Sequence, residues 1–134
     1  MTKIVDIEGI GPVYGAKLKE VGIGSVKALL EQGSTPKGRQ DLAEKSGLSE
    51  GLILEWVNHA DLYRIRGVGS EYSDLLEESG VDTVPELAQR NPEHLLEKMI
   101  AVNGEKKLVR RLPVLSQVQS WVEQAKKLER VVTY

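Results

Sequence analysis

The chain has 134 residues, of which 40% are hydrophobic and 28% charged, with a net charge of −2 and no cysteine. This length suits one compact domain or two small ones, and the lack of cysteine excludes a disulfide framework, a thiolate nucleophile and a cysteine-based metal site. No apolar run reaches the ~18 residues of a membrane span, and residues 1–6 lack the apolar segment of a secretory signal. We therefore expect a cytoplasmic protein with no membrane partner.

Small polar residues and prolines mark the expected helix starts in the first half, and glycines mark the expected ends. Pro12 can begin the first helix, since a proline in the first turn loses no intrahelical hydrogen bond. Three further starts are marked by capping residues: Ser25, Thr35 and Ser49. The first three helices are expected to end at glycines: Gly22, Gly33 and Gly47.

The second half shows the same signals. Capping-box spacing at residues 83–86 and 116–119, and Asn91 before a proline, predict three helix starts. Two apolar stripes follow: Leu95, Leu96, Met99 and Ile100, then Val118, Trp121, Val122 and Ala125. Spacing of i, i+4 predicts one helix that carries four basic residues: Lys106, Lys107, Arg110 and Arg111. No alternating run is long enough for a sheet, so the predicted fold class is all-α.

The sequence contains an internal repeat. Residues 7–14 recur as residues 65–72, an offset of 58 that also matches Gly22 with Gly80. Residues 56–60 recur as residues 121–125 at an offset of 65, so the second copy has gained about seven residues. A repeat of this kind indicates a duplicated structural unit. It predicts two homologous halves, residues 1–62 and 63–134, packed as one unit or as two.

The repeat is sharpest at two Gly-x-Gly turns, which we call the first glycine turn (residues 9–11) and the second glycine turn (residues 67–69). Glycine permits positive φ and close backbone approach, while Ile10 and Val68 between the glycines are expected to point into the core. Amides at the start of a helix lack intrahelical partners and lie at the positive end of the helix dipole. Each turn therefore predicts an anion-binding site.

This pattern resembles the helix-hairpin-helix family of DNA-repair and recombination proteins, and an uncharacterised bacterial family with duplicated helix-hairpin-helix motifs. The resemblance rests on an aliphatic-x-Gly-aliphatic-Gly pattern followed by a small residue: Ile7, Gly9, Ile10, Gly11 and Gly15, then Ile65, Gly67, Val68, Gly69 and Ser73. It implies an all-α protein of two tandem helix-hairpin-helix halves, each a small SAM-like helical bundle. In that family the hairpin amides typically bind a DNA phosphate without reading bases, and nearby Lys or Arg reinforce the contact.

The resemblance thus implies a non-catalytic module that binds nucleic-acid backbone weakly and without sequence preference. Its candidate contacts are the two turns and the basic residues around them: Gly9, Ile10, Gly11, Lys17 and Lys19; Arg64, Arg66, Gly67, Val68, Gly69 and Ser70; and Lys106, Lys107, Arg110 and Arg111. Three acidic residues beside the turns oppose such binding: Glu8, Glu71 and Asp74.

A protein–protein adaptor is the alternative function. The net charge is −1 over residues 1–60, −6 over residues 61–97 and +5 over residues 98–134. Complementary charged faces set specificity and association rate between proteins. The basic cluster at 106–111 could therefore meet the acidic segment 61–97, within the molecule or in a second copy.

Other functional patterns are weak. Residues 3–15 imitate a dinucleotide-binding strand and glycine loop, but the parallel strands that this motif requires are missing. His59 and His94 have no nucleophile or carboxylate at a telling spacing. Trp56 and Trp121 recur at matching positions and are interpreted as packing anchors. We expect no enzymatic activity, cofactor, metal or small-molecule substrate.

Overall fold

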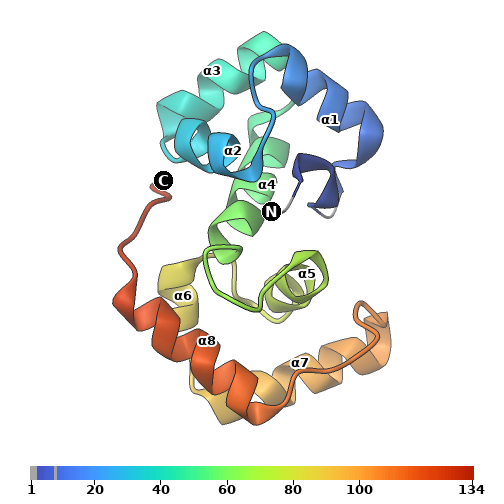
Figure 1. Ribbon diagram of the computed structural model, residues 1–134, viewed down its shortest axis with the longest axis vertical. Helices are drawn as coiled ribbons and strands as arrows, with labels where there is room; N and C mark the ends of the chain where they lie inside the picture. Colours follow the sequence, from blue (N-terminus) through green and yellow to red (C-terminus); the bar gives the residue numbers. More distant parts are fainter. Residues whose placement is uncertain (1–2, 8) are drawn as a thin grey trace. The chain divides into compact units, whose positions relative to one another are not determined.

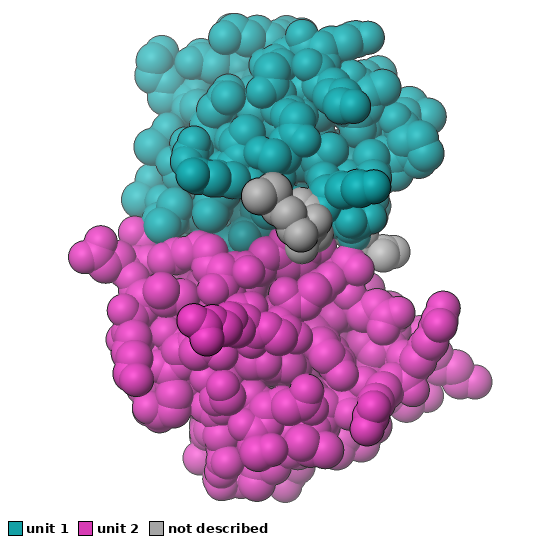
Figure 2. Space-filling model, viewed as in Figure 1, with its two compact units in different colours: residues 1–61, 131–134 teal, residues 62–130 magenta. Residues whose placement is uncertain are grey.

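The computed structural model describes residues 3–7 and 9–134, which form eight α-helices and one 3-10 helix (Figure 1). The described residues contain no β-strand, so the all-α prediction is confirmed. The chain divides into two compact units: unit 1 comprises residues 1–61 and 131–134, and unit 2 comprises residues 62–130 (Figure 2). Within the described ranges, no helix is both long enough and apolar enough to cross a membrane.

Unit 1 contains the 3-10 helix η1 (Ile4–Asp6), α1 (Gly11–Glu20), α2 (Val26–Gly33), α3 (Pro36–Ser46) and all of α4 (Glu50–Leu62) except its last residue. The three predicted capping residues of this unit are confirmed. The hydroxyl of Ser25 accepts from the Ala28 amide at 3.0 Å, and that of Thr35 accepts from the Gly38 amide at 3.0 Å. Ser49 accepts in the same way from the Leu52 amide at 3.1 Å. Each bond satisfies an amide that the helix itself leaves unpaired.

Residues 131–134 belong to unit 1, where Arg39 holds them. Only 5% of Arg39 is exposed, and its guanidinium donates to the Gly33 carbonyl at 2.8 Å and to the Thr133 carbonyl at 2.7 Å. The Thr133 amide donates in turn to the Ser34 carbonyl at 2.8 Å. Burial lowers the pKa of the Arg39 guanidinium from its usual value. Arginine stays charged even so, and its charge-assisted bonds fix this extended segment on α2 and α3.

Unit 2 contains α5 (Ser70–Glu78), α6 (Val84–Ala88), α7 (Pro92–Lys106) and α8 (Leu115–Lys127). Helix α8 packs against α6 and α7, and α5 packs against α7. Their apolar faces meet in one core, whose fully buried members include Leu75, Leu76, Leu87 and Leu95. The predicted cap at Asn91 is confirmed, since its side chain accepts from the His94 amide at 3.0 Å.

Two predicted capping boxes in unit 2 are wrong in detail. The Thr83 hydroxyl caps no amide; the Glu86 carboxylate instead accepts from the Asp82 amide at 3.1 Å. Helix α8 begins at Leu115, before the predicted cap Ser116, and the Gln117 side chain accepts from the Val114 amide at 2.9 Å. Glu86 thus bonds the residue before the predicted cap, and at α8 the bond is made by Gln117 and not by Gln119 of the predicted box.

The prediction that Lys106, Lys107, Arg110 and Arg111 share one helix is also wrong. Helix α7 ends at Lys106, and Lys107 takes a left-handed conformation with φ of 52°. The Asn103 side chain then bonds both the amide and the carbonyl of Val109, at 3.0 and 3.3 Å. Val109 enters the core at 7% exposure, and Pro113 disfavours helix in the residue before it. Burial of Val109 and the Asn103 bridge therefore outweigh the helical spacing of the basic residues.

Both units repeat the same local structures at the offset of 58. After α1, the amides of Gly22 and Ile23 close back onto the Lys19 and Leu18 carbonyls, at 3.0 and 2.8 Å. After α5, the Gly80 and Val81 amides bond the Glu77 and Leu76 carbonyls, at 3.0 and 2.9 Å. Gly22 and Gly80 have φ of 89° and 93°, the left-handed conformation that such a helix end requires.

Candidate nucleic-acid interface

The two glycine turns share one backbone geometry at their first glycine. Gly9 and Gly67 have φ of 90° and 93°, a region in which a side chain is strained. The Ile10 amide donates to the Ile7 carbonyl at 3.1 Å, and the Val68 amide donates to the Ile65 carbonyl at 3.2 Å. Ile10 and Val68 are buried, so the prediction that they point into the core is confirmed.

Each first glycine lies against a buried tryptophan. A Cβ built on Gly67 would stand 3.0 Å from the Trp121 indole nitrogen, and one on Gly9 would stand 3.6 Å from the Trp56 indole nitrogen. Trp56 and Trp121 are 1% and 2% exposed, which confirms them as packing anchors. Each tryptophan also packs on a tyrosine, with ring centroids 5.2 Å apart for Tyr14 and 5.1 Å apart for Tyr72. This repeated aromatic pair fixes the turn to the last helix of its repeat.

The second glycines of the two turns differ. Gly11 has φ of 62° and is the first residue of α1. Gly69 instead has φ of −108° and ψ of −161°, an extended conformation, and caps α5 from outside the helix. Glycine permits positive φ at both positions of a turn, but Gly69 does not use it. Helix α5 starts one residue later in the repeat than α1 does, which leaves an additional extended position in the second turn.

The second glycine turn presents unpaired amides at the start of α5. Gly67 and Gly69 are exposed and Ser70 is partly exposed. Among the residues that the structure describes, none accepts a hydrogen bond from the amides of these three residues. Helix α5 runs for nine residues from Ser70, so the positive end of its dipole lies at the same place.

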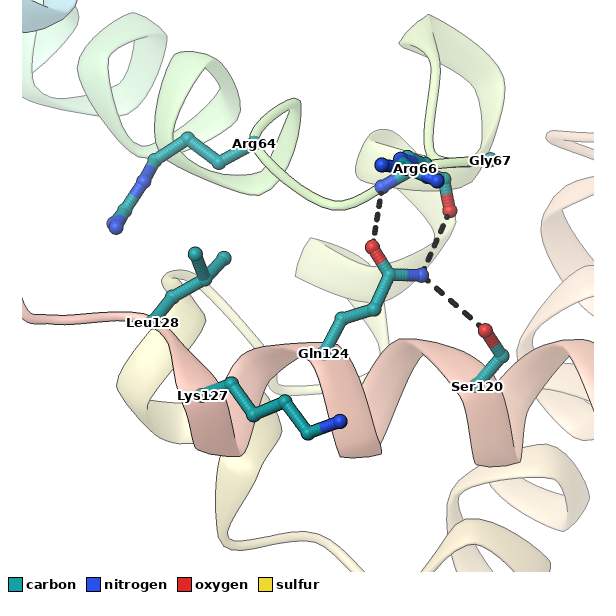
Figure 3. A pocket seen from close by; sticks show the side chains of 7 residues that line it. All are labelled: Arg64, Arg66, Gly67, Ser120, Gln124, Lys127 and Leu128. Carbon is teal, nitrogen blue, oxygen red and sulfur yellow. Dashed lines mark hydrogen bonds between the residues drawn. The ribbon is translucent and has the colours of Figure 1, made fainter.

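A pocket of about 700 Å³ opens beside this turn. It is lined by Gly67 of the turn, by residues just before the turn, and by residues in or just after α8: Arg64, Arg66, Gly67, Ser120, Gln124, Lys127 and Leu128 (Figure 3). Three of these side chains are cationic, and none of the lining residues that the structure describes is acidic. Glu71, in the first turn of α5, is not among the lining residues.

Gln124 joins α8 to the turn. Its side-chain oxygen accepts from the Arg66 amide at 2.9 Å, while its nitrogen donates to the Arg66 carbonyl at 3.3 Å and to the Ser120 hydroxyl at 3.2 Å. Figure 3 shows this carboxamide reaching from α8 to the backbone of Arg66. These two hydrogen bonds to the backbone of one residue fix the position of the turn relative to α8. They thereby hold Arg66 where its side chain lines the pocket.

The three cations differ in how they are held. The Arg64 guanidinium donates to the Glu129 carbonyl at 2.8 Å, which ties it to the chain that follows α8. Arg66 and Lys127 are exposed, and neither forms an ion pair with any residue of the described ranges. Cations that no carboxylate neutralises are available to an anionic ligand.

The basic residues predicted for the first turn lie elsewhere. Lys17 and Lys19 are exposed in the last turn of α1, the opposite end of the helix from residues 9–11. Lys19 lines a separate pocket of about 600 Å³ in unit 1, together with Lys3, with Pro12 directly after the first turn, and with apolar residues such as Ile4 and Val5. The structure thus brings Arg64 and Arg66 to their turn, whereas Lys17 and Lys19 stand away from theirs.

The basic cluster at 106–111 lies outside the pocket of the second turn. The Lys106 ammonium donates to the Glu78 carboxylate at 2.5 Å, and this bond raises the Lys106 pKa from its usual value. The Tyr72 hydroxyl donates to the Arg111 carbonyl at 2.9 Å. Lys107, Arg110 and Arg111 are exposed. The cluster therefore meets the acidic segment 61–97 inside unit 2, through a Lys106–Glu78 pair.

Sequence reasoning missed the α8 side of the pocket. Ser120, Gln124, Lys127 and Leu128 follow the turn by more than fifty residues, and only tertiary packing brings them to it. One signal was present: Gln124 lies in the segment 121–125, which repeats the segment 56–60. Trp121 is interpreted as a packing anchor, and Gln124 follows it by three residues on the same side of a helix.

Comparison with models of known protein families gives a match. The family model described as "Domain of unknown function (DUF4332)" matches residues 8–128. The chain belongs to the DUF4332 family. No curated protein and no solved structure matches it. The matched range of this DUF4332 protein contains both tryptophan-backed turns and the pocket beside the second.

The two glycines of the second turn predict opposite responses to the same substitution. Gly67→Ser puts a side chain at φ of 93° and a Cβ 3.0 Å from the Trp121 indole nitrogen, so we expect a loss of about 1–3 kcal/mol in unfolding free energy. Gly69→Ser meets nothing within 4 Å and adds a good capping residue in an extended conformation. Its expected change is within about 0.5 kcal/mol or stabilising. Thermal or urea unfolding of the two variants checks this, and equal effects would mean that the turn is built differently.

Proposed function

We propose that this DUF4332 protein is a non-catalytic binding module that holds the backbone of a nucleic acid weakly and without sequence preference. The proposal includes the finer architecture implied by the sequence: two tandem helix-hairpin-helix halves, residues 1–62 and 63–134, with the glycine turns as hairpins. One observation carries it. Arg64, Arg66 and Lys127 line one pocket with the exposed Gly67, and none of the described residues that line it is acidic.

Phosphate chemistry fits this arrangement. A phosphodiester oxygen accepts well from main-chain amides at the start of a helix, where the dipole adds a favourable positive potential. The unpaired amides of Gly67, Gly69 and Ser70 lie at the start of α5, and Gly67 shares its pocket with three cationic side chains. Contacts of this kind position a protein on the backbone and carry no sequence information.

The lining of the pocket supports backbone contact over base recognition. Proteins that hold single strands stack bases on exposed aromatic rings. None of the described residues that line this pocket is aromatic, and the Tyr72 and Trp121 rings pack on each other with centroids 5.1 Å apart. The Gln124 carboxamide, which could read a base edge, is already bonded to Arg66 and Ser120. We therefore expect the same affinity for duplexes of unrelated sequence.

A salt titration tests the proposed function. With about three phosphates neutralised, the logarithm of the association constant should fall with log salt at a slope of about −2.7, so affinity should drop about 40-fold between 50 and 200 mM. The measurement is fluorescence anisotropy of two labelled duplexes of unrelated sequence, which should give equal affinities. Absence of detectable binding at ~50 mM salt would remove the proposal.

A protein–protein adaptor is the second candidate, and the surface at 107–114 favours it. This segment joins exposed Arg110 and Arg111 to two exposed apolar side chains, Leu112 at 36% and Val114 at 60%. Exposed apolar groups ringed by charge are typical of protein contact surfaces. The expected partner is an acidic protein surface or a second copy of the chain.

Reversing these two charges tests the adaptor function. Arg110→Glu with Arg111→Glu should abolish a concentration-dependent rise in molar mass, measured by light scattering, and leave the melting temperature within about 2 °C, because both side chains are exposed. Lys126→Glu, on the exposed end of α8, serves as the control and should keep the rise. A constant monomer mass for the unmodified chain at every concentration, with no acidic protein recovered on it, would contradict the adaptor function.

A further inference from the structure

We infer that the backbone contact is made by one unit alone: unit 2 holds the phosphates, and unit 1 carries the opposite charge at the matching positions. This inference rests on the proposed function and concerns which of the two glycine turns performs it. Each unit serves as the reference for the other, because the turn, the tyrosine and the tryptophan recur in both.

The matching positions are defined by the structure as well as by the sequence. Gly9 lies on Trp56 as Gly67 lies on Trp121, with the indole nitrogen as the nearest atom in both. Residues of the two turns therefore correspond at an offset of 58, and residues of the helices that carry the tryptophans, α4 and α8, correspond at an offset of 65. Residues on either side of these anchors can be compared one to one.

Charge is reversed at these positions. Arg64 and Arg66 of unit 2 correspond to Asp6 and Glu8, and Ser120 corresponds to Glu55. At the offset of 65, Lys127 corresponds to Leu62. The pocket of the second turn thus carries three positive charges, where the matching positions of the first copy carry three negative ones. Asp6 and Glu55 are exposed, and Glu8 lies outside the described residues. Carboxylates at these positions repel a phosphate backbone.

The first turn also lacks a donor. Ser70, whose amide is unpaired at the start of α5, corresponds to Pro12. Proline has no amide hydrogen, so the first turn presents one donor fewer to an anion. This loss is independent of charge, and it affects the same function.

The lysines of unit 1 do not restore the site. Lys17 and Lys19 follow Gly11 by six and eight residues, which places their backbones about 9 and 12 Å along the axis of α1 from its start. Both stand in the last turn of that helix. Lys17 and Lys19 therefore do not supply at the first turn the cations that Arg64 and Arg66 supply at the second.

Charge reversal in each unit tests the inference by duplex anisotropy at ~50 mM salt. Arg66→Glu with Lys127→Glu changes the net charge by the same amount as Lys17→Glu with Lys19→Glu, so the two pairs are matched in overall electrostatics. The unit 2 pair should weaken binding at least about tenfold, and the unit 1 pair at most about threefold. All four side chains are exposed, so both proteins should fold, and circular dichroism melting confirms it.

Ser70→Pro provides a test that leaves charge unchanged. Gly69 before it is extended, as a residue before proline prefers, and proline is accepted at the first helical position. The variant should melt like the unmodified protein and bind about tenfold more weakly, because one charge-assisted donor is gone.

The outcomes separate the two claims. The inference is overturned if the unmodified protein binds the duplex and both charge-reversed pairs weaken binding equally, or the unit 1 pair weakens it more. That result leaves the proposed function standing. Undiminished binding by Ser70→Pro also overturns it. No binding by the unmodified protein overturns the proposed function itself.

Discussion

In both units a glycine with positive φ lies against the indole nitrogen of a buried tryptophan, and the rest of the turn is built on that contact. Only glycine takes this backbone conformation without strain, and at Gly67 a Cβ would also stand 3.0 Å from the indole nitrogen, which is a tight contact. The apolar residue after the glycine is thereby directed into the core, and the next amides are directed outward. Local backbone chemistry and long-range packing therefore fix the turn together.

The same frame carries different chemistry in the two units. In unit 2 the turn is followed by an extended Gly69 and an unpaired Ser70 amide, and Gln124 ties it to α8 with three cations around the pocket. In unit 1 the matching stretch has Pro12 and acidic residues. A shared backbone shape is thus compatible with opposite electrostatic preferences, since hydrogen-bond donors and charges are set by side chains that the packing leaves exposed.

The sequence predicted the helices of unit 1 and both turns because their signals are local. Ser25 and Thr35 cap through side chains three residues from the amides that they bond, and Gly67 is required by its own φ. Prediction failed where distant contacts decide. The helix expected through Arg110 is ended by burial of Val109. The pocket likewise depends on Gln124, 58 residues after Arg66 along the chain, and no local pattern reports that approach.

The amide spectrum of the protein during titration with a short duplex tests the central claim most directly, because glycine amides report on each turn separately. Binding at the second turn should shift the ¹⁵N–¹H resonances of Gly67, Gly69 and Ser70, with shifts that shrink as salt is added. The resonances of Gly9 and Gly11 should stay in place. Equal shifts at both turns, or shifts confined to residues outside them, would contradict the account.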